Sequence, residues 1–140
     1  MIQRKQTLWL LLATIASFLT LQLPFYTGNV VDAITNVNAF TELNARYNIL
    51  ITIISVAVGV IALITIFLYN DRKKQIVFST LNCLLSITVI VLYFLQIKKF
   101  TDGAISITSL IALVIPVLII LAIIGINKDE KLIKSVDRLR

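Results

Sequence analysis

Four long runs without a charged residue constrain this chain more than any other feature. Residues 6–31, 47–70, 75–97 and 103–127 contain no Lys, Arg, Asp or Glu. A helix needs about 20 apolar residues to cross a hydrocarbon core of about 30 Å, and each run is long enough. The runs are continuously apolar, whereas barrel strands alternate. We therefore predict four transmembrane helices, over residues 7–25, 46–69, 76–97 and 104–126.

Composition excludes a water-soluble globule. Hydrophobic residues make up 59% of the 140 residues and charged residues 14%, and the mean hydropathy is +0.97. Soluble domains carry about a quarter charged residues, so this chain has too little polar surface for water. We predict one domain, an all-α integral membrane protein with an up-down-up-down four-transmembrane-helix bundle and a short cytoplasmic C-terminal helical tail.

Turn and cap residues set the predicted ends of the helices. Pro24 closes the first helix, and Asn44 or Thr41 can cap the second. A short connection after the second helix makes the second and third helices an antiparallel hairpin. Asp102, in the turn 101–103, can cap the fourth helix. The first run lacks a small-x-small cleavage site, so we expect a retained anchor rather than a signal peptide.

Lys and Arg are distributed unequally between the two predicted sides of the membrane. Ten of the 13 basic residues fall on the side that holds both ends of the chain: Arg4, Lys5, Arg72, Lys73, Lys74, Lys128, Lys131, Lys134, Arg138 and Arg140. The other side holds Arg46, Lys98 and Lys99. Because basic loops stay cytoplasmic, we predict that both ends of the chain lie in the cytoplasm.

The outer loop, residues 26–45, is the only connection of any size. Its Val30, Val31, Ile34 and Val37 recur at helical spacing. We interpret it as a short amphipathic helix that lies on the membrane or caps the bundle. A contact surface for an external partner is the alternative.

The tail, residues 127–140, combines charges with an apolar stripe. On a helical wheel, Leu132, Ile133, Val136 and Leu139 fall within an arc of about 120°. No Gly or Pro follows Gly125, so the fourth helix can continue into the tail. The tail can lie against anionic lipid headgroups or dock on protein. We expect Asp129 and Asp137 to take part if it docks on protein.

Three separated motifs carry a family resemblance. The opening MIQRKQTLWLLLA, the hairpin LYNDRKKQIVFSTLN and the closing KDEKLIKSVDRLR resemble an uncharacterised family of small four-span inner-membrane proteins from Gram-negative bacteria. In that family a proline in the last span precedes a charged tail, and Pro116 matches it. The resemblance implies no activity, substrate or catalytic residue.

The predicted spans offer little catalytic chemistry. They contain no ionisable Asp, Glu, Lys or Arg, which proton coupling or intramembrane proteolysis would need. The chain has no His, and Cys83 is its single cysteine, so no metal site is expected. We expect no enzyme activity, no cofactor and no nucleic-acid binding.

Polar residues in the spans are candidate contacts. Ser79, Asn82 and Ser86, with Tyr93 beyond them, share one face of the third helix. We expect the Asn82 amide to hydrogen-bond a neighbouring helix, a partner contact being the alternative. Ser55 and Gly59 form a small-xxx-small pair suited to close packing. Pro116 should kink the fourth helix and free the carbonyl of Ala112.

Two functional classes remain. The first is an accessory, structural or assembly subunit of a larger inner-membrane complex, whose partners are the lipid bilayer and other integral membrane proteins. The second is a minimal transporter or channel for an unknown solute. The sequence favours the first, because the spans lack charged gates and the tail is suited to docking.

Overall fold

The computed structural model describes residues 5–31, 38–69 and 71–137. Helices dominate it, and three short strands form a small sheet. The helices are α1 (Lys5–Leu19), α2 (Ile49–Phe67), α3 (Arg72–Ile97) and α4 (Ser109–Asp137). The strands are β1 (Tyr26–Val31), β2 (Asn38–Leu43) and β3 (Asp102–Ile105). The prediction of four helices is confirmed, whereas an all-α fold was wrong.

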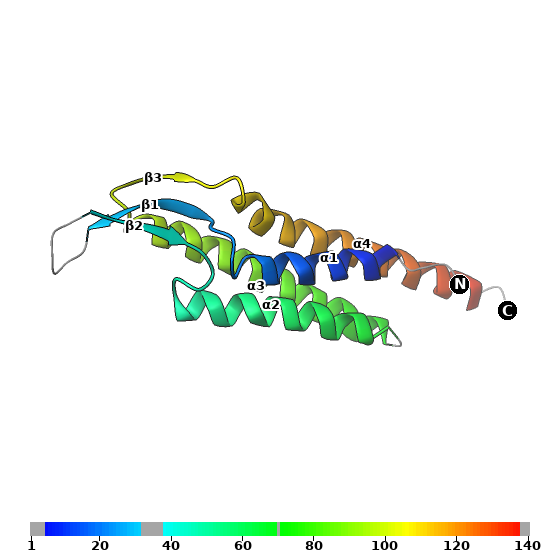
Figure 1. Cartoon of the computed structure of the whole chain (residues 1–140). Helices are drawn as coiled ribbons and strands as arrows, with labels where there is room; N and C mark the ends of the chain where they lie inside the picture. The colour runs from blue at the N-terminus through cyan, green and yellow to red at the C-terminus, as the bar shows by residue number, and fades with distance from the viewer. Residues whose placement is uncertain (1–4, 32–37, 70, 138–140) are drawn as a thin grey trace.

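The four helices form an antiparallel bundle (Figure 1). Helix α1 packs against α2 and α4, and α3 packs against the same two helices. The chain passes up and down through the bundle, so the start of α1 and the end of α4 lie at one end, away from the sheet (Figure 1). This end carries Lys5, Arg72, Lys73, Lys74, Lys128 and Lys131, and we call it the basic end. The opposite end is the sheet end.

Three of the helices are long and apolar enough to cross a membrane, namely α2, α3 and Ser109–Leu132 of α4. Large apolar side chains face outward on all four helices, among them Leu11, Ile53, Leu84 and Val117. An outward apolar surface of this extent fits lipid better than water. The fold therefore suggests membrane association.

Helix α1 is shorter than predicted and ends at Leu19 rather than near Phe25. Its 15 residues rise about 22 Å. Beyond it the chain makes turns, with the amide of Gln22 donating to the carbonyl of Leu19 at 3.1 Å. The hydroxyl of Thr20 donates to the carbonyl of Ser17 at 2.7 Å, and Pro24 disfavours helical geometry before it. Local hydrogen bonds thus replace the last predicted turns of helix.

The outer connection forms strands where an amphipathic helix was predicted. Strands β1 and β2 pair antiparallel, with Tyr26 opposite Leu43, and β3 adds to the other edge of β1. Residues 32–37, which include Ile34 and Val37 of the predicted helix, lie outside the described residues. Residues 102–105, predicted as a turn and the start of the fourth helix, form β3, and α4 begins only at Ser109. The pairing of the strands thus determines the local structure here, rather than the helical spacing of the apolar residues.

Two glycines face each other where β1 and β3 meet. Gly28 pairs with Gly103, and a Cβ on Gly28 would collide with the carbonyl oxygen of Asp102 and lie 2.9 Å from the Cα of Gly103. A Cβ on Gly103 would lie 2.5 Å from the carbonyl oxygen of Thr27. The strands approach this closely only because neither residue has a side chain.

Aromatic side chains join the sheet to the bundle. The rings of Phe25 and Tyr93 stack with centroids 4.4 Å apart, and Phe94 meets Phe25 edge to face at 5.8 Å. The side chains of Leu43 and Ala45 are buried in the same cluster. Such aromatic pairs add to the free energy of burial, so the sheet is a fixed cap on the bundle.

The N-termini of α2 and α3 are capped by side chains. Asn48 caps α2, its Oδ1 accepting from the amide of Leu50 at 2.9 Å; the predicted cap was Asn44 or Thr41. Asp71 caps α3, accepting from the amide of Lys74 and pairing with the Lys74 ammonium at 3.2 Å. The hydrogen bond from the Lys74 amide, more than any other cause, lowers the pKa of Asp71 below its ordinary value.

Candidate functional site

One face of α3 is polar and buried. Gln75, Ser79, Asn82 and Ser86 recur at alternating spacings of four and three, and none is more than 3% exposed. Val89 and Tyr93 continue the same face towards the sheet end. The spacing correctly placed Ser79, Asn82, Ser86 and Tyr93 together. Gln75 was missed because the predicted helix began after it.

The other helices add polar side chains to the same interior. Thr65 of α2 meets α3 near the basic end, where the Gln75 amide nitrogen donates to its carbonyl at 3.2 Å. Towards the sheet end, the Ser17 hydroxyl of α1 donates to the carbonyl of Ser55 on α2 at 2.7 Å. We call the whole set the polar column: Gln6, Ser17, Thr20, Ser55, Thr65, Gln75, Ser79, Asn82 and Ser86.

Several polar atoms of this column have no hydrogen-bond partner within the described part of the chain. They are both amide atoms of Gln6 and Asn82, the hydroxyls of Ser55 and Ser79, and the amide oxygen of Gln75. The interhelical hydrogen bond predicted for the Asn82 amide is therefore not formed. Because Asn82 is fully buried between helices, its side chain also does not face outward towards a partner protein. Unpaired buried polar atoms are costly in a bundle.

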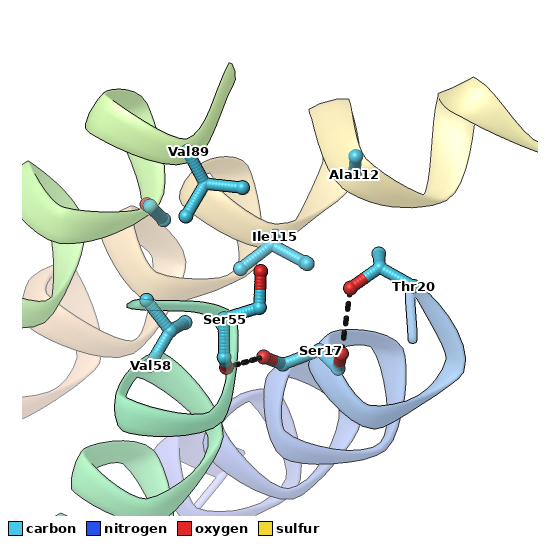
Figure 2. Close-up of a pocket in the computed structure, with 8 residues that line it drawn as sticks. Ser17, Thr20, Ser55, Val58, Val89, Ala112 and Ile115 are labelled. Carbon is cyan, nitrogen blue, oxygen red and sulfur yellow. Dashed lines mark hydrogen bonds between the residues drawn. The ribbon is translucent and has the colours of Figure 1, made fainter. Parts of the chain in front are cut away.

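A small cavity lies where α1, α2, α3 and α4 meet, towards the sheet end of the bundle (Figure 2). About 10 Å³ is open to the centre of a water molecule, which is near the minimum for one water. The polar lining residues are Ser17, Thr20, Ser55 and Ser86, and the apolar ones are Val58, Val89, Ala112 and Ile115. In Figure 2 the Ser55 hydroxyl points towards Ile115, away from its own helix.

Hydrogen bonds limit what this cavity can bind. The hydroxyls of Ser17, Thr20 and Ser86 already donate to the carbonyls of Ser55, Ser17 and Cys83 respectively. Their oxygens can therefore only accept from a further group. The cavity suits one small hydrogen-bond donor such as water, and it has no room for a larger solute.

The small-xxx-small pair of α2 faces α1 of the same chain. A Cβ on Gly59 would lie 3.2 Å from the Phe18 ring and 3.5 Å from the Ser17 hydroxyl, and Ser55 accepts from Ser17. Pro116 lies inside α4, and its side chain is buried. Since proline has no N–H, the carbonyl of Ala112 lacks its usual helical donor, and Ala112 borders the cavity.

The tail continues α4 as predicted. Ile126 is fully buried, and the helix runs on to Asp137, roughly three turns further. Asp129 is half-buried, whereas Leu132 is 64% exposed. The side chains of Ile133, Val136 and Asp137, and the whole of Leu139, lie outside the described residues.

Among the described residues, no group of three or more His, Cys, Asp or Glu side chains could hold a metal ion. Cys83 is half-buried and free. Besides the hydroxyl of Tyr93, the buried polar side chains of the described residues are Gln, Asn, Ser and Thr, all uncharged. The arrangement offers uncharged hydrogen-bonding groups.

Comparison with known proteins identifies a family. A family model described as a domain of unknown function (DUF4293) matches residues 2–139. No curated protein and no solved structure matches the chain. The match confirms an uncharacterised family, as the three motifs implied, and covers the motifs at both ends of the chain.

Proposed function

The chain belongs to this family of unknown function, and we propose that it is a non-enzymatic integral membrane protein that serves as an accessory, structural or assembly subunit. In this proposal the protein lies in the bacterial inner membrane, with the basic end in the cytoplasm. The partners are the bilayer and other integral membrane proteins of a larger complex. The excess of Lys and Arg at the basic end supports this orientation.

The extension of α4 is the observation that carries the proposal. In Figure 1, α4 continues past the end of the α2–α3 pair at the basic end. A bundle needs no such projection for its own core, because the buried residues of α4 end at Ile126 among those whose side chains are described. A rigid helix that leaves the bundle with charges of both signs, including Lys128, Asp129 and Lys131, suits recognition of a protein surface.

Truncation tests this role. The full chain and a variant that ends at Asn127 would each carry an N-terminal affinity tag and be purified from their native membrane in mild detergent. We expect the full chain to be part of an assembly of fixed stoichiometry, identified by cross-linking and mass spectrometry. The truncated chain should leave that assembly while its thermal unfolding is unchanged. Recovery of both chains as the same lone oligomer would contradict the proposal.

The polar column favours the second candidate, a minimal transporter or channel. Polar side chains follow α3 from Gln75 to Ser86, which could guide water or a small polar solute. The narrow cavity and the uncharged interior weigh against this function. Purified chain in liposomes tests it: solute flux that Asn82→Leu and Ser55→Ala abolish would support a conduit over a subunit.

A further inference from the structure

A groove runs along the outside of α1 and α2 at the basic end. Its volume is about 730 Å³, within the range of small-molecule sites, which is roughly 300–1,000 Å³. The groove is separate from the polar column, because it opens on the outer surface of the bundle. Its lining includes Leu8, Leu11, Ile66, Phe67, Lys5 and Tyr69.

Most of the side chains that line the groove are apolar. Leu8 is 56% exposed and Phe67 is 69% exposed, so both present large apolar surface next to a hollow rather than to the core. Leu11 and Ile66 continue this surface towards the middle of the bundle. A surface of this kind fits a flexible hydrocarbon chain that lies parallel to the helices.

The mouth of the groove is positively charged. Lys5 and Tyr69 line it. Arg72 does not itself line the groove but begins α3 three residues after Tyr69. The Nη1 atom of Arg72 is buried and has no hydrogen-bond partner within the described part of the chain. Asp71, the acidic residue before Arg72, forms an ion pair with Lys74, its Oδ2 lying 3.2 Å from the Lys74 Nζ. The charges of Lys5, Arg72 and Lys73 thus attract an anion to this end.

We propose that this groove binds one anionic phospholipid. Its phosphate lies at the mouth beside Lys5, at the end of the bundle where Arg72 begins α3, and an acyl chain follows Leu8, Leu11 and Phe67. Arginine and lysine are suited to phosphate oxygens, and tyrosine is favoured at the depth of the headgroups. The proposal rests on the membrane placement proposed above, but it is independent of the docking role of the tail.

Native mass spectrometry of the full chain tests the site directly. The chain in mild detergent would be offered phosphatidylglycerol and phosphatidylcholine with identical acyl chains. Each nearby basic residue contributes about 1 kcal/mol, or about fivefold in affinity. We therefore expect phosphatidylglycerol to be preferred, and Lys5→Gln with Arg72→Gln to weaken its binding by roughly 25-fold.

A matched pair of substitutions controls for net charge. Lys98→Gln with Lys99→Gln removes two exposed charges at the sheet end, and the lipid preference should remain. Leu8→Trp with Leu11→Trp fills the groove and should lower the binding of both lipids while thermal unfolding is unchanged. This groove variant keeps the test valid if the Arg72 variant does not fold.

Three outcomes would overturn the proposal. They are equal binding of the two lipids, equal loss of phosphatidylglycerol binding in both charge variants, and competition by inorganic phosphate as strong as that by the lipid. A chain that keeps its assembly but fails these tests would lack the lipid site while still acting as a subunit. A chain that binds phosphatidylglycerol but forms no larger assembly would have the lipid site but would not act as a subunit.

Discussion

Single buried amides show most clearly how the interior of this bundle differs from an apolar core. Asn82 is fully buried, and neither of its amide atoms has a hydrogen-bond partner within the described part of the chain. A hydrogen bond between transmembrane helices contributes about 0.6 kcal/mol on average, whereas an unpaired buried polar group costs about 1–3 kcal/mol. The sign of an Asn82 substitution therefore depends on whether the amide is paired.

We predict that Asn82→Leu leaves the free energy of unfolding unchanged or raises it by up to about 1 kcal/mol, because it replaces two unpaired polar atoms with methyl groups and keeps the number of side-chain heavy atoms. Ser17→Ala is the control. It removes the interhelical bond to the Ser55 carbonyl and should lower the free energy of unfolding by about 0.6 kcal/mol. Denaturant unfolding in detergent micelles measures both. A loss of 1 kcal/mol or more in Asn82→Leu would show that the amide is paired inside the bundle.

The residues of the column were predictable only in part. Ser79, Asn82 and Ser86 could be placed together, because helical spacing fixes which side chains share a face. Their partners could not be predicted, because a sequence gives neither the neighbour of a face nor the height at which two helices meet. Ser17 and Ser55, 38 residues apart, form a hydrogen bond that only the packing of α1 on α2 determines.

At the scale of elements, the sheet depends on the Gly28–Gly103 crossing. We predict that Gly28→Ala or Gly103→Ala lowers the free energy of unfolding by about 1–3 kcal/mol, because backbone atoms occupy the space that a Cβ needs. Gly59→Ala is a matched control. Its Cβ would meet the Phe18 ring, a side chain that can shift, so a smaller loss is expected. Equal losses for all three variants would contradict the glycine crossing.

The tail of α4 gives a second prediction at this scale. If it docks on protein, Asp129→Asn or Asp137→Asn should reduce co-purification of the partner severalfold, although either change makes the tail more cationic. Lipid attraction alone predicts the opposite, since fewer negative charges strengthen contact with anionic headgroups. Lys131→Gln is the control that weakens lipid attachment. Intact assembly in both Asp variants would show that the tail is a lipid anchor.

The strands were missed for a physical reason. Strand β1 pairs with β3 across more than 70 residues of sequence, Tyr26 lying opposite Ile105, and no local pattern reports such a pairing. The helices were predictable because each continuous apolar run is a local property. Two cues to the sheet were nevertheless present in the sequence, namely the β-branched Val30–Val31 pair and the glycines at 28 and 103.

At the scale of the whole molecule, the two ends differ in kind. The sheet end is closed by paired strands and stacked aromatic rings, whereas the basic end carries the excess of Lys and Arg, the groove and the projecting helix. The proposed subunit role and the proposed lipid site both use the basic end. Both therefore depend on which side of the membrane that end faces, and on whether all four helices, the short α1 included, cross the bilayer.

Topology mapping with reporter fusions tests this central claim most directly. Enzymes active only in the periplasm would be fused before Met1, inserted near Asn38 or fused after Arg140, with cytoplasm-active reporters at the same points as controls. Our account predicts periplasmic activity near Asn38 alone and cytoplasmic activity at both ends of the chain. Periplasmic activity before Met1 would show that α1 does not cross, and periplasmic activity after Arg140 would show that the basic end faces outward; either result would contradict the account.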